Sequence, residues 1–85
     1  MVIVGKTISK ADERILITAL DFDSVNHLRM LSKVARQALV DAGVETIGDF
    51  RYLEDAALEK LKLSEDDLEM ARAAQEILIN TASFP

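Results

Sequence analysis

The chain has 85 residues, of which 49% are hydrophobic and 29% are charged, and it carries a formal net charge of -5. This length leaves room for one core only, and the hydrophobic content excludes an intrinsically disordered chain. Because the chain has no cysteine, a disulfide framework and a thiolate metal site are excluded as well. We therefore expect a single domain that is held together by packing alone.

The first seven residues predict an extended segment and no membrane span. Residues 1–4 are apolar, but Gly5 and Lys6 follow at once, so the run is too short for a signal peptide or a transmembrane helix. We expect a cytoplasmic protein with no membrane partner.

Residues 10–20 allow two interpretations. Ser9 and Asp12 are typical of a helix start, whereas the sequence Ile-Leu-Ile-Thr at residues 15–18 would suit a strand. We favour the helix. Residues 1–30 then form an N-terminal extension, with one strand-like segment and one or two helices packed on the core.

The next clear pattern predicts a helix over residues 33–42. Ser32 can cap its first turn, as Asp23 or Ser24 can cap a shorter helix before it. Apolar side chains recur on one face with the period of a helix. This face comprises Val34, Ala35, Ala38, Leu39 and Ala42.

A tight hairpin is expected after this helix. Gly43 can adopt the left-handed conformation that ends a helix, and Thr46 can cap the short helix expected over residues 47–53. A further helical turn without an obvious cap is expected at residues 56–61. The predicted structural residues of the hairpin are Gly43, Val44, Thr46, Ile47 and Gly48.

The acidic turn at residues 64–67 predicts the start of the last helix, which we expect to span about residues 65–79. Ser64 and Asp67 have the spacing of a capping box, and acids in a first turn complement the helix dipole. Residues 80–85 are expected to form a frayed tail. The apolar stripe of this helix comprises Leu68, Ala71, Ala74 and Leu78.

These elements together predict an all-α fold. Short helices joined by three-residue turns favour a compact bundle of about five short helices, with helix-hairpin-helix elements, over long parallel rods. Residues 31–79 would form the helical core of this bundle.

The pattern of residues 31–50 carries a family resemblance. It is similar to the C-terminal domain of the bacterial RNA polymerase alpha subunit, in which Leu-Ser/Thr precedes a helix and Thr-Ile/Val-Gly-Asp-Leu follows a hairpin. The resemblance extends over residues 31–79 and implies a helix-hairpin-helix fold and a role in transcription. The matching residues are Leu31, Ser32, Leu39, Val44, Thr46, Ile47, Gly48, Asp49 and Phe50.

The chain departs from this family where the family holds DNA. The family's Arg and Asn places are taken by Val34 and Gln37, and its Gly-Lys-Lys-Ser-like hairpin is replaced by Ser64 and the acidic residues 65–67. At ~4 Å from a phosphate, each carboxylate would cost about 1 kcal/mol even in water. We therefore expect at most weak binding to DNA through this face.

Two charged clusters remain as candidate sites. The acids Glu65, Asp66, Asp67 and Glu69 are either a capped, solvated helix start or a docking patch for a basic protein surface, and both can hold together. The residual nucleic-acid candidate comprises Lys33, Arg36 and Gln37.

No pattern favours catalysis, a metal or a cofactor. The sequence has no nucleophile-base pair and no Gly-rich phosphate loop, and His27 is its only histidine. Asp21 and Asp23 lack the Gly and closing Glu of a calcium loop, so we expect them to cap helices.

The aromatic residues are expected to act separately. Phe22, Phe50, Tyr52 and Phe84 are too few and too scattered for a base-stacking platform. Phe50 is expected to lie in the core.

We therefore expect a non-catalytic protein-interaction module related to transcription, which has lost the family's DNA contacts. RNA polymerase or a transcription regulator is the expected partner. Two alternatives stay open: a small helix-hairpin-helix DNA-binding protein, and a self-associating module similar to a SAM domain.

Overall fold

Hydroxyl side chains begin four of the helices, as the sequence predicts. In the computed structural model, which describes residues 8–82, each of these oxygens accepts a hydrogen bond from the backbone N–H three residues later, at 3.1 or 3.2 Å. Such a bond satisfies one of the free donors in the first turn of a helix. The capping residues are Ser9, Ser32, Thr46 and Ser64.

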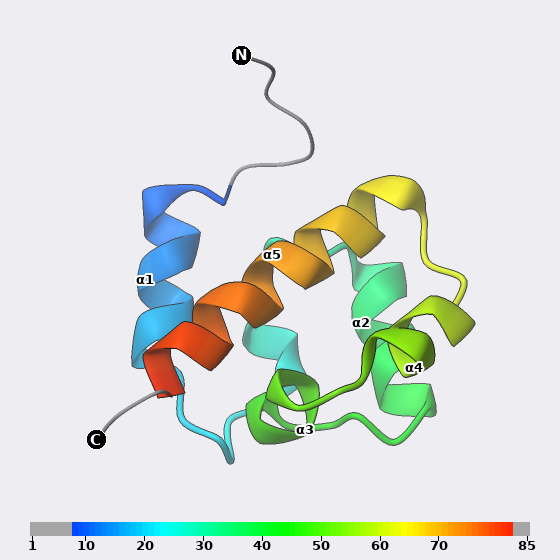
Figure 1. Ribbon diagram of the computed structural model, residues 1–85, viewed down its shortest axis with the longest axis horizontal. Helices are drawn as coiled ribbons and strands as arrows, with labels where there is room; N and C mark the ends of the chain where they lie inside the picture. The colour runs from blue at the N-terminus through cyan, green and yellow to red at the C-terminus, as the bar shows by residue number, and fades with distance from the viewer. Residues whose placement is uncertain (1–7, 83–85) are drawn as a thin grey trace.

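The described residues form five α-helices and one short 3-10 helix, with no strand among them (Figure 1). The predicted all-α class is confirmed, and so is the helix in the first part of residues 10–20. The predicted extended segment at residues 1–7 lies outside the described residues. The elements are α1 (Lys10–Thr18), η1 (Val25–His27), α2 (Lys33–Asp41), α3 (Ile47–Arg51), α4 (Asp55–Lys60) and α5 (Glu65–Ala82).

The last helix, α5, is longer than predicted. It has 18 residues and continues to Ala82, beyond the expected end at residue 79. No glycine or proline occurs within it, so nothing in the sequence stops the helix there. Residues 80–82 are therefore helical, and the rest of the predicted tail lies outside the described residues.

Helix α5 runs across the molecule and packs against α1 and α3 (Figure 1). Every element contributes at least one fully buried side chain to the core beneath it. Burial of each leucine-sized side chain stabilises the fold by about 1.5–3 kcal/mol. The largest fully buried side chains are Leu16, Val25, Leu28, Leu31, Leu39, Ile47, Phe50, Leu58 and Leu78.

Helix α2 buries only one side of its predicted apolar face. Ala35 and Leu39 are fully buried, whereas Val34 is 78% exposed and Ala42 is exposed as well. The predicted face spans an arc of roughly 140° at 100° per residue, and the core lies under the side that carries residues 35 and 39. Val34 therefore lies on the predicted apolar face but outside the part of that face that the core covers.

The hairpin between α2 and α3 forms at the predicted glycine. Gly43 has a φ of 90°, a conformation that strains any residue with a Cβ, although no atom lies within 4 Å of the Cβ position. The N–H of Val44 donates to the carbonyl of Leu39 at 2.8 Å. Val44 and Ile47 are buried, so the turn brings α3 back onto the core.

The linker between α1 and η1 runs along the start of α3. The N–H groups of Ile47 and Gly48 donate to the carbonyls of Asp23 and Asp21, at 2.7 and 2.9 Å. The linker thus satisfies two of the free donors in the first turn of α3. A Cβ on Gly48 would lie 3.1 Å from two atoms of Asp21, so a larger residue would push the linker away.

The other end of α3 is held by α5. Gln75 is buried, and its side-chain amide donates to the carbonyls of Phe50 at 3.0 Å and Leu53 at 2.9 Å. The carbonyl of Phe50 also accepts a hydrogen bond from the N–H of Leu53 at 3.2 Å, so Gln75 adds a partner from α5 at this end of α3. A helix of five residues, too short to be stable by itself, is therefore held at both ends by neighbouring elements.

Gly43→Ala is expected to lower the free energy of unfolding by about 1–2 kcal/mol, which is the cost of a left-handed backbone for a residue with a Cβ. Urea denaturation followed by circular dichroism measures the change. Gly43→Asn is the matched control, because asparagine tolerates this conformation better and should lose less. Equal losses for the two variants would contradict the backbone explanation.

Candidate functional site

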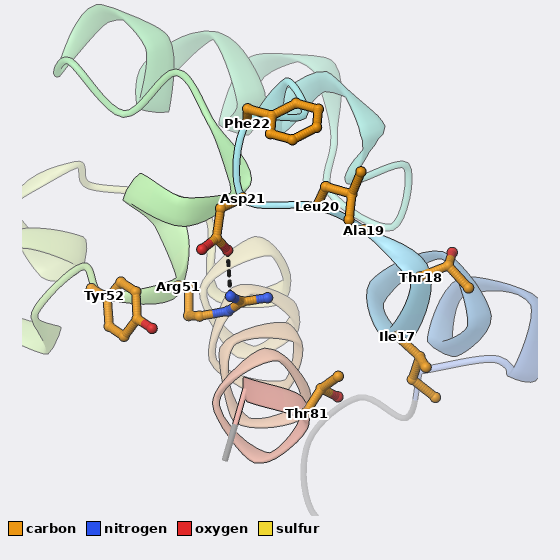
Figure 2. Close-up of a pocket in the computed structure, with 9 residues that line it drawn as sticks. All are labelled: Ile17, Thr18, Ala19, Leu20, Asp21, Phe22, Arg51, Tyr52 and Thr81. Carbon is orange, nitrogen blue, oxygen red and sulfur yellow. Dashed lines mark hydrogen bonds and ion pairs between the residues drawn. The ribbon is translucent and has the colours of Figure 1, made fainter. Parts of the chain in front are cut away.

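One surface groove gathers residues from three parts of the chain (Figure 2). It has a volume of about 580 Å³ and lies where the end of α1 and the linker after it meet the end of α3 and the last turn of α5. We call it the linker groove. Its lining comprises Ile17, Thr18, Ala19, Leu20, Asp21, Phe22, Arg51, Tyr52 and Thr81.

Large apolar side chains are exposed around the linker groove. Phe22 is 78% exposed and Tyr52 is 70% exposed, and Ile17 and Leu20 are about half exposed. The described part of the chain exposes six large hydrophobic residues, and these four are among them. A lone exposed apolar residue is ordinary, but a cluster around a depression is typical of a binding surface.

Backbone geometry turns these side chains outward. On α1, Leu16 is buried in the core, so its neighbour Ile17 is rotated by about 100° toward the surface. In the linker, the carbonyls of Asp21 and Asp23 are bound to α3, and Phe22 between them is left exposed (Figure 2). The groove therefore follows from the same contacts that hold α3.

An ion pair forms the floor of the linker groove. The guanidinium group of Arg51 contacts the carboxylate of Asp21 (Figure 2). The side chain of Arg51 is only 9% exposed, whereas that of Asp21 is 59% exposed, and Nε of Arg51 is buried without a hydrogen-bond partner. The groove thus offers a carboxylate to solvent, while the cation lies beneath it.

The two threonines of the lining use their hydroxyl protons within their own helices. Thr18 donates to the carbonyl of Arg14 at 2.9 Å, and Thr81 donates to the carbonyl of Ile77 at 2.8 Å. Apart from the ion pair, the other lining side chains are aliphatic or aromatic. The groove is therefore suited to apolar contact, with one exposed acid as its main polar feature.

Asp67, predicted as part of a docking patch, joins two helix starts. Its carboxylate accepts hydrogen bonds from the N–H and the hydroxyl of Ser32, at 3.0 and 2.6 Å, and from the hydroxyl of Ser64 at 3.1 Å. Partial burial raises the pKa of Asp67, but these three bonds together hold that pKa below its ordinary value. The carboxylate thus links the start of α5 to the start of α2.

This contact corrects the predicted capping box. The N–H of Asp67 does donate to the hydroxyl oxygen of Ser64, at 3.2 Å. The carboxylate, however, turns to Ser32, which is 35 residues away, instead of to the backbone of its own helix start. In the rest of the predicted patch, Glu65 and Asp66 are exposed and Glu69 is half-buried.

Two of the three residues in the nucleic-acid candidate have partners within the fold. Arg36 is half-buried, and its Nη1 donates to the carbonyl of Asn26 in η1 at 3.1 Å. The amide of Gln37 donates to the carboxylate of Asp41 at 2.9 Å. Lys33 is exposed and lines, with Gln37, a separate depression of about 460 Å³.

The other candidates from the sequence have structural or exposed positions. The side chains of Asp21 and Asp23 do not cap helices as predicted, although their carbonyls bind the first turn of α3. The carboxylate of Asp21 pairs with Arg51, and that of Asp23 accepts a hydrogen bond from the N–H of Leu20 at 2.9 Å. His27 is exposed at the end of η1. Across residues 8–82, no group of three or more His, Cys, Asp or Glu side chains is placed to hold a metal ion.

The helices were compared with what a membrane span requires. Within residues 8–82, none of the helices combines the length and the apolar character that crossing a bilayer requires.

Comparison with known proteins adds no site: no family model, curated protein or solved structure matches the chain. The candidate site therefore rests on this chain's own residues.

Phe50 is buried in the core as predicted, but Phe22 and Tyr52 share one groove although the sequence separates them widely. The available signal was the linker sequence Leu-Asp-Phe-Asp, in which an aromatic residue stands between two acids.

Asp67→Asn is expected to lower the free energy of unfolding by about 1–2 kcal/mol at neutral pH, because it weakens charge-assisted hydrogen bonds to two serines. The pKa of Asp67 is lower in the folded chain than in the unfolded one. Its contribution is therefore present above the ordinary pKa and is lost as the pH falls through the folded pKa. Urea unfolding at several pH values should show the variant and the wild type converging in acid.

Glu65→Gln is the control for this titration. Glu65 lies in the same helical turn and is exposed, so its replacement should change the free energy of unfolding by no more than about 0.5 kcal/mol. A difference between Asp67→Asn and wild type that stays constant at every pH would count against the role given to the carboxylate.

Asp21→Ala and Arg51→Met test the floor of the groove. The first variant leaves a buried guanidinium group unpaired, whereas methionine keeps an apolar stem and removes the charge. We expect Asp21→Ala to lower the free energy of unfolding by about 1–2 kcal/mol and Arg51→Met to lower it by less. The loss is smaller than for a fully buried pair, because the side chain of Asp21 is more than half exposed. Thermal unfolding measures both, and a larger loss for Arg51→Met would reverse this interpretation.

Proposed function

We propose that this chain is a non-catalytic protein-interaction module that binds its partner in the linker groove. The observation that carries the proposal is the gathering of four exposed apolar side chains around one depression. Exposed apolar side chains add nothing to the core, so a partner that covers them accounts for their position. Tyrosine and phenylalanine are also enriched at protein interfaces.

A link to transcription comes from the sequence resemblance. Residues 31–50 are similar to the C-terminal domain of the RNA polymerase alpha subunit, and a helix-hairpin-helix fold of that type is the finer proposal. The left-handed Gly43 and the Thr46 cap support it. On this proposal, the partner is RNA polymerase or a regulator that binds it.

Proteins fit this proposal better than duplex DNA does. The family's Arg place is the exposed apolar Val34, and its Asn place is Gln37, whose amide is bound to Asp41. The hairpin that should approach phosphate carries the acids at residues 65–67 instead, which repel a phosphate backbone.

Purified bacterial RNA polymerase offers a direct test. The immobilised wild-type chain should bind the enzyme with a Kd of about 1–10 µM, in the range of weak, transient interfaces. The double variant Phe22→Ser, Tyr52→Ser should lose at least about tenfold in affinity. Both side chains are exposed, so the variant should keep its fold, which circular dichroism checks.

Val34→Ser is the matched control for this experiment. Val34 is as exposed as Phe22 but lines the separate depression on α2, so its replacement should leave binding unchanged. Binding that survives the double variant would remove the groove from the proposal. Tight, salt-sensitive binding to a labelled DNA duplex would overturn the proposal as a whole. If sedimentation shows a dimer of the wild-type chain and the double variant is a monomer, the groove binds a second copy of the chain instead.

A further inference from the structure

We infer that the exposed face of α2 binds the same face of a second copy of this chain, with the two helices antiparallel. The inference goes beyond the proposed function, because it concerns self-association through a surface separate from the linker groove. This surface, which we call the α2 face, lines a depression of about 460 Å³. It comprises Lys33, Val34, Gln37, Ala38 and Asp41.

The centre of the α2 face offers one large and one small apolar side chain. Val34 is 78% exposed and Ala38 is half-buried, and residues four apart are neighbours on the surface of a helix. The core does not use them, because it is covered by Ala35 and Leu39 on the other side of α2. In an antiparallel pair, Val34 of each copy can pack over the small Ala38 of the other.

The ends of the α2 face carry opposite charges. Lys33 is the first residue of α2 and Asp41 is the last, and both side chains are exposed. Eight residues of helix separate them, which is about 12 Å, and Gln37 lies halfway between them. Antiparallel copies bring Lys33 of each chain to Asp41 of the other and form two ion pairs, whereas parallel copies would bring like charges together.

This order of charges is the reverse of the order in the other α-helices. The helices α1, α3, α4 and α5 each carry an acid in the first turn, which the helix dipole favours. Helix α2 begins with a cation and ends with an acid, and its last turn has no basic residue. Asp67 of α5 reaches the start of α2 through Ser32. The lysine of an antiparallel copy would bring a cation to the other end.

A second copy is the occupant that matches both ends of the face. A two-fold axis through Gln37 turns the α2 face onto itself, so an identical chain necessarily carries the complementary charges at the same spacing. Asp41 accepts a hydrogen bond from the amide of Gln37 at 2.9 Å, and a carboxylate can accept several. Within residues 8–82, neither Lys33 nor Asp41 forms an ion pair, so both charges are open to a partner.

The size of the α2 face sets the expected strength of this dimer. Helix α2 has nine residues and is therefore only about 14 Å long, so the contact is smaller than a standard stable interface. We expect a Kd of about 0.1–1 mM. Sedimentation equilibrium of the intact chain, at concentrations from about 0.05 to about 1 mM, measures it, and the dimer should weaken as the salt concentration rises.

Two single variants and their mixture test the antiparallel pairing. Lys33→Asp and Asp41→Lys each bring like charges together in a self-pair, so each variant alone should associate at least about tenfold more weakly than the wild type. An equimolar mixture of the two restores both ion pairs and should associate as well as the wild type. Misfolding of either variant cannot produce this recovery, and circular dichroism checks the fold of each.

Lys10→Asp is the matched control for the charge change. Lys10 is exposed and is the first residue of α1 after the cap Ser9, as Lys33 is the first residue of α2 after Ser32. This variant should leave the dimer unchanged, and so should the double variant of the linker groove.

Four results would each overturn the inference. They are a wild-type chain that stays monomeric at about 1 mM, a mixture of the two α2 variants that stays monomeric, an equal loss for Lys10→Asp and Lys33→Asp, and a dimer that the variant of the linker groove abolishes. The titration with RNA polymerase decides the proposed function separately.

Discussion

Helix α3 has five residues and so leaves more backbone groups unsatisfied at its ends than it can pair internally. The linker provides carbonyls to its first turn, Thr46 provides a hydroxyl oxygen, and Gln75 of α5 provides an amide to the carbonyl of Phe50 near its end. These partners come from separate parts of the chain. Both ends of helix α3 are therefore held by segments that lie far from it in the sequence.

This constraint also separates the residues that hold the fold from those that form the candidate site. In the linker, backbone carbonyls are used to hold α3, whereas the side chain of Phe22 is left to solvent. Arg51 pairs with Asp21 beneath the groove, and the next residue, Tyr52, is exposed at its edge. The surface of the groove can therefore vary in sequence while the contacts beneath it are kept.

Short-range hydrogen bonds made much of this fold predictable from the sequence. The caps at Ser9, Ser32 and Thr46 each act over three residues, and the left-handed turn at Gly43 depends on that residue alone. The starts of α1, α2 and α3 followed from these signals without any knowledge of tertiary structure. The all-α class followed in turn, because the apolar side chains between the caps recur with the period of a helix.

Contacts between distant residues were not predictable in the same way. Nothing local distinguishes an Asp67 that closes its own capping box from one that binds Ser32, and only the folded chain brings Phe22 and Tyr52 to one groove. The exposure of Val34 was not predictable for a related reason. The period of a helix defines an apolar arc, but the position of neighbouring elements decides which part of that arc is covered.

The carboxylate of Asp67 has a further consequence for how this chain opens. Because it binds the cap residues of both α2 and α5, fraying of either helix start removes a partner from the other. Residues 32–67 then form a closed loop whose two ends are secured by one side chain. The amide hydrogens in the first turns of these helices should exchange with solvent through a shared opening event, so that segments far apart in the sequence behave as a single cooperative unit.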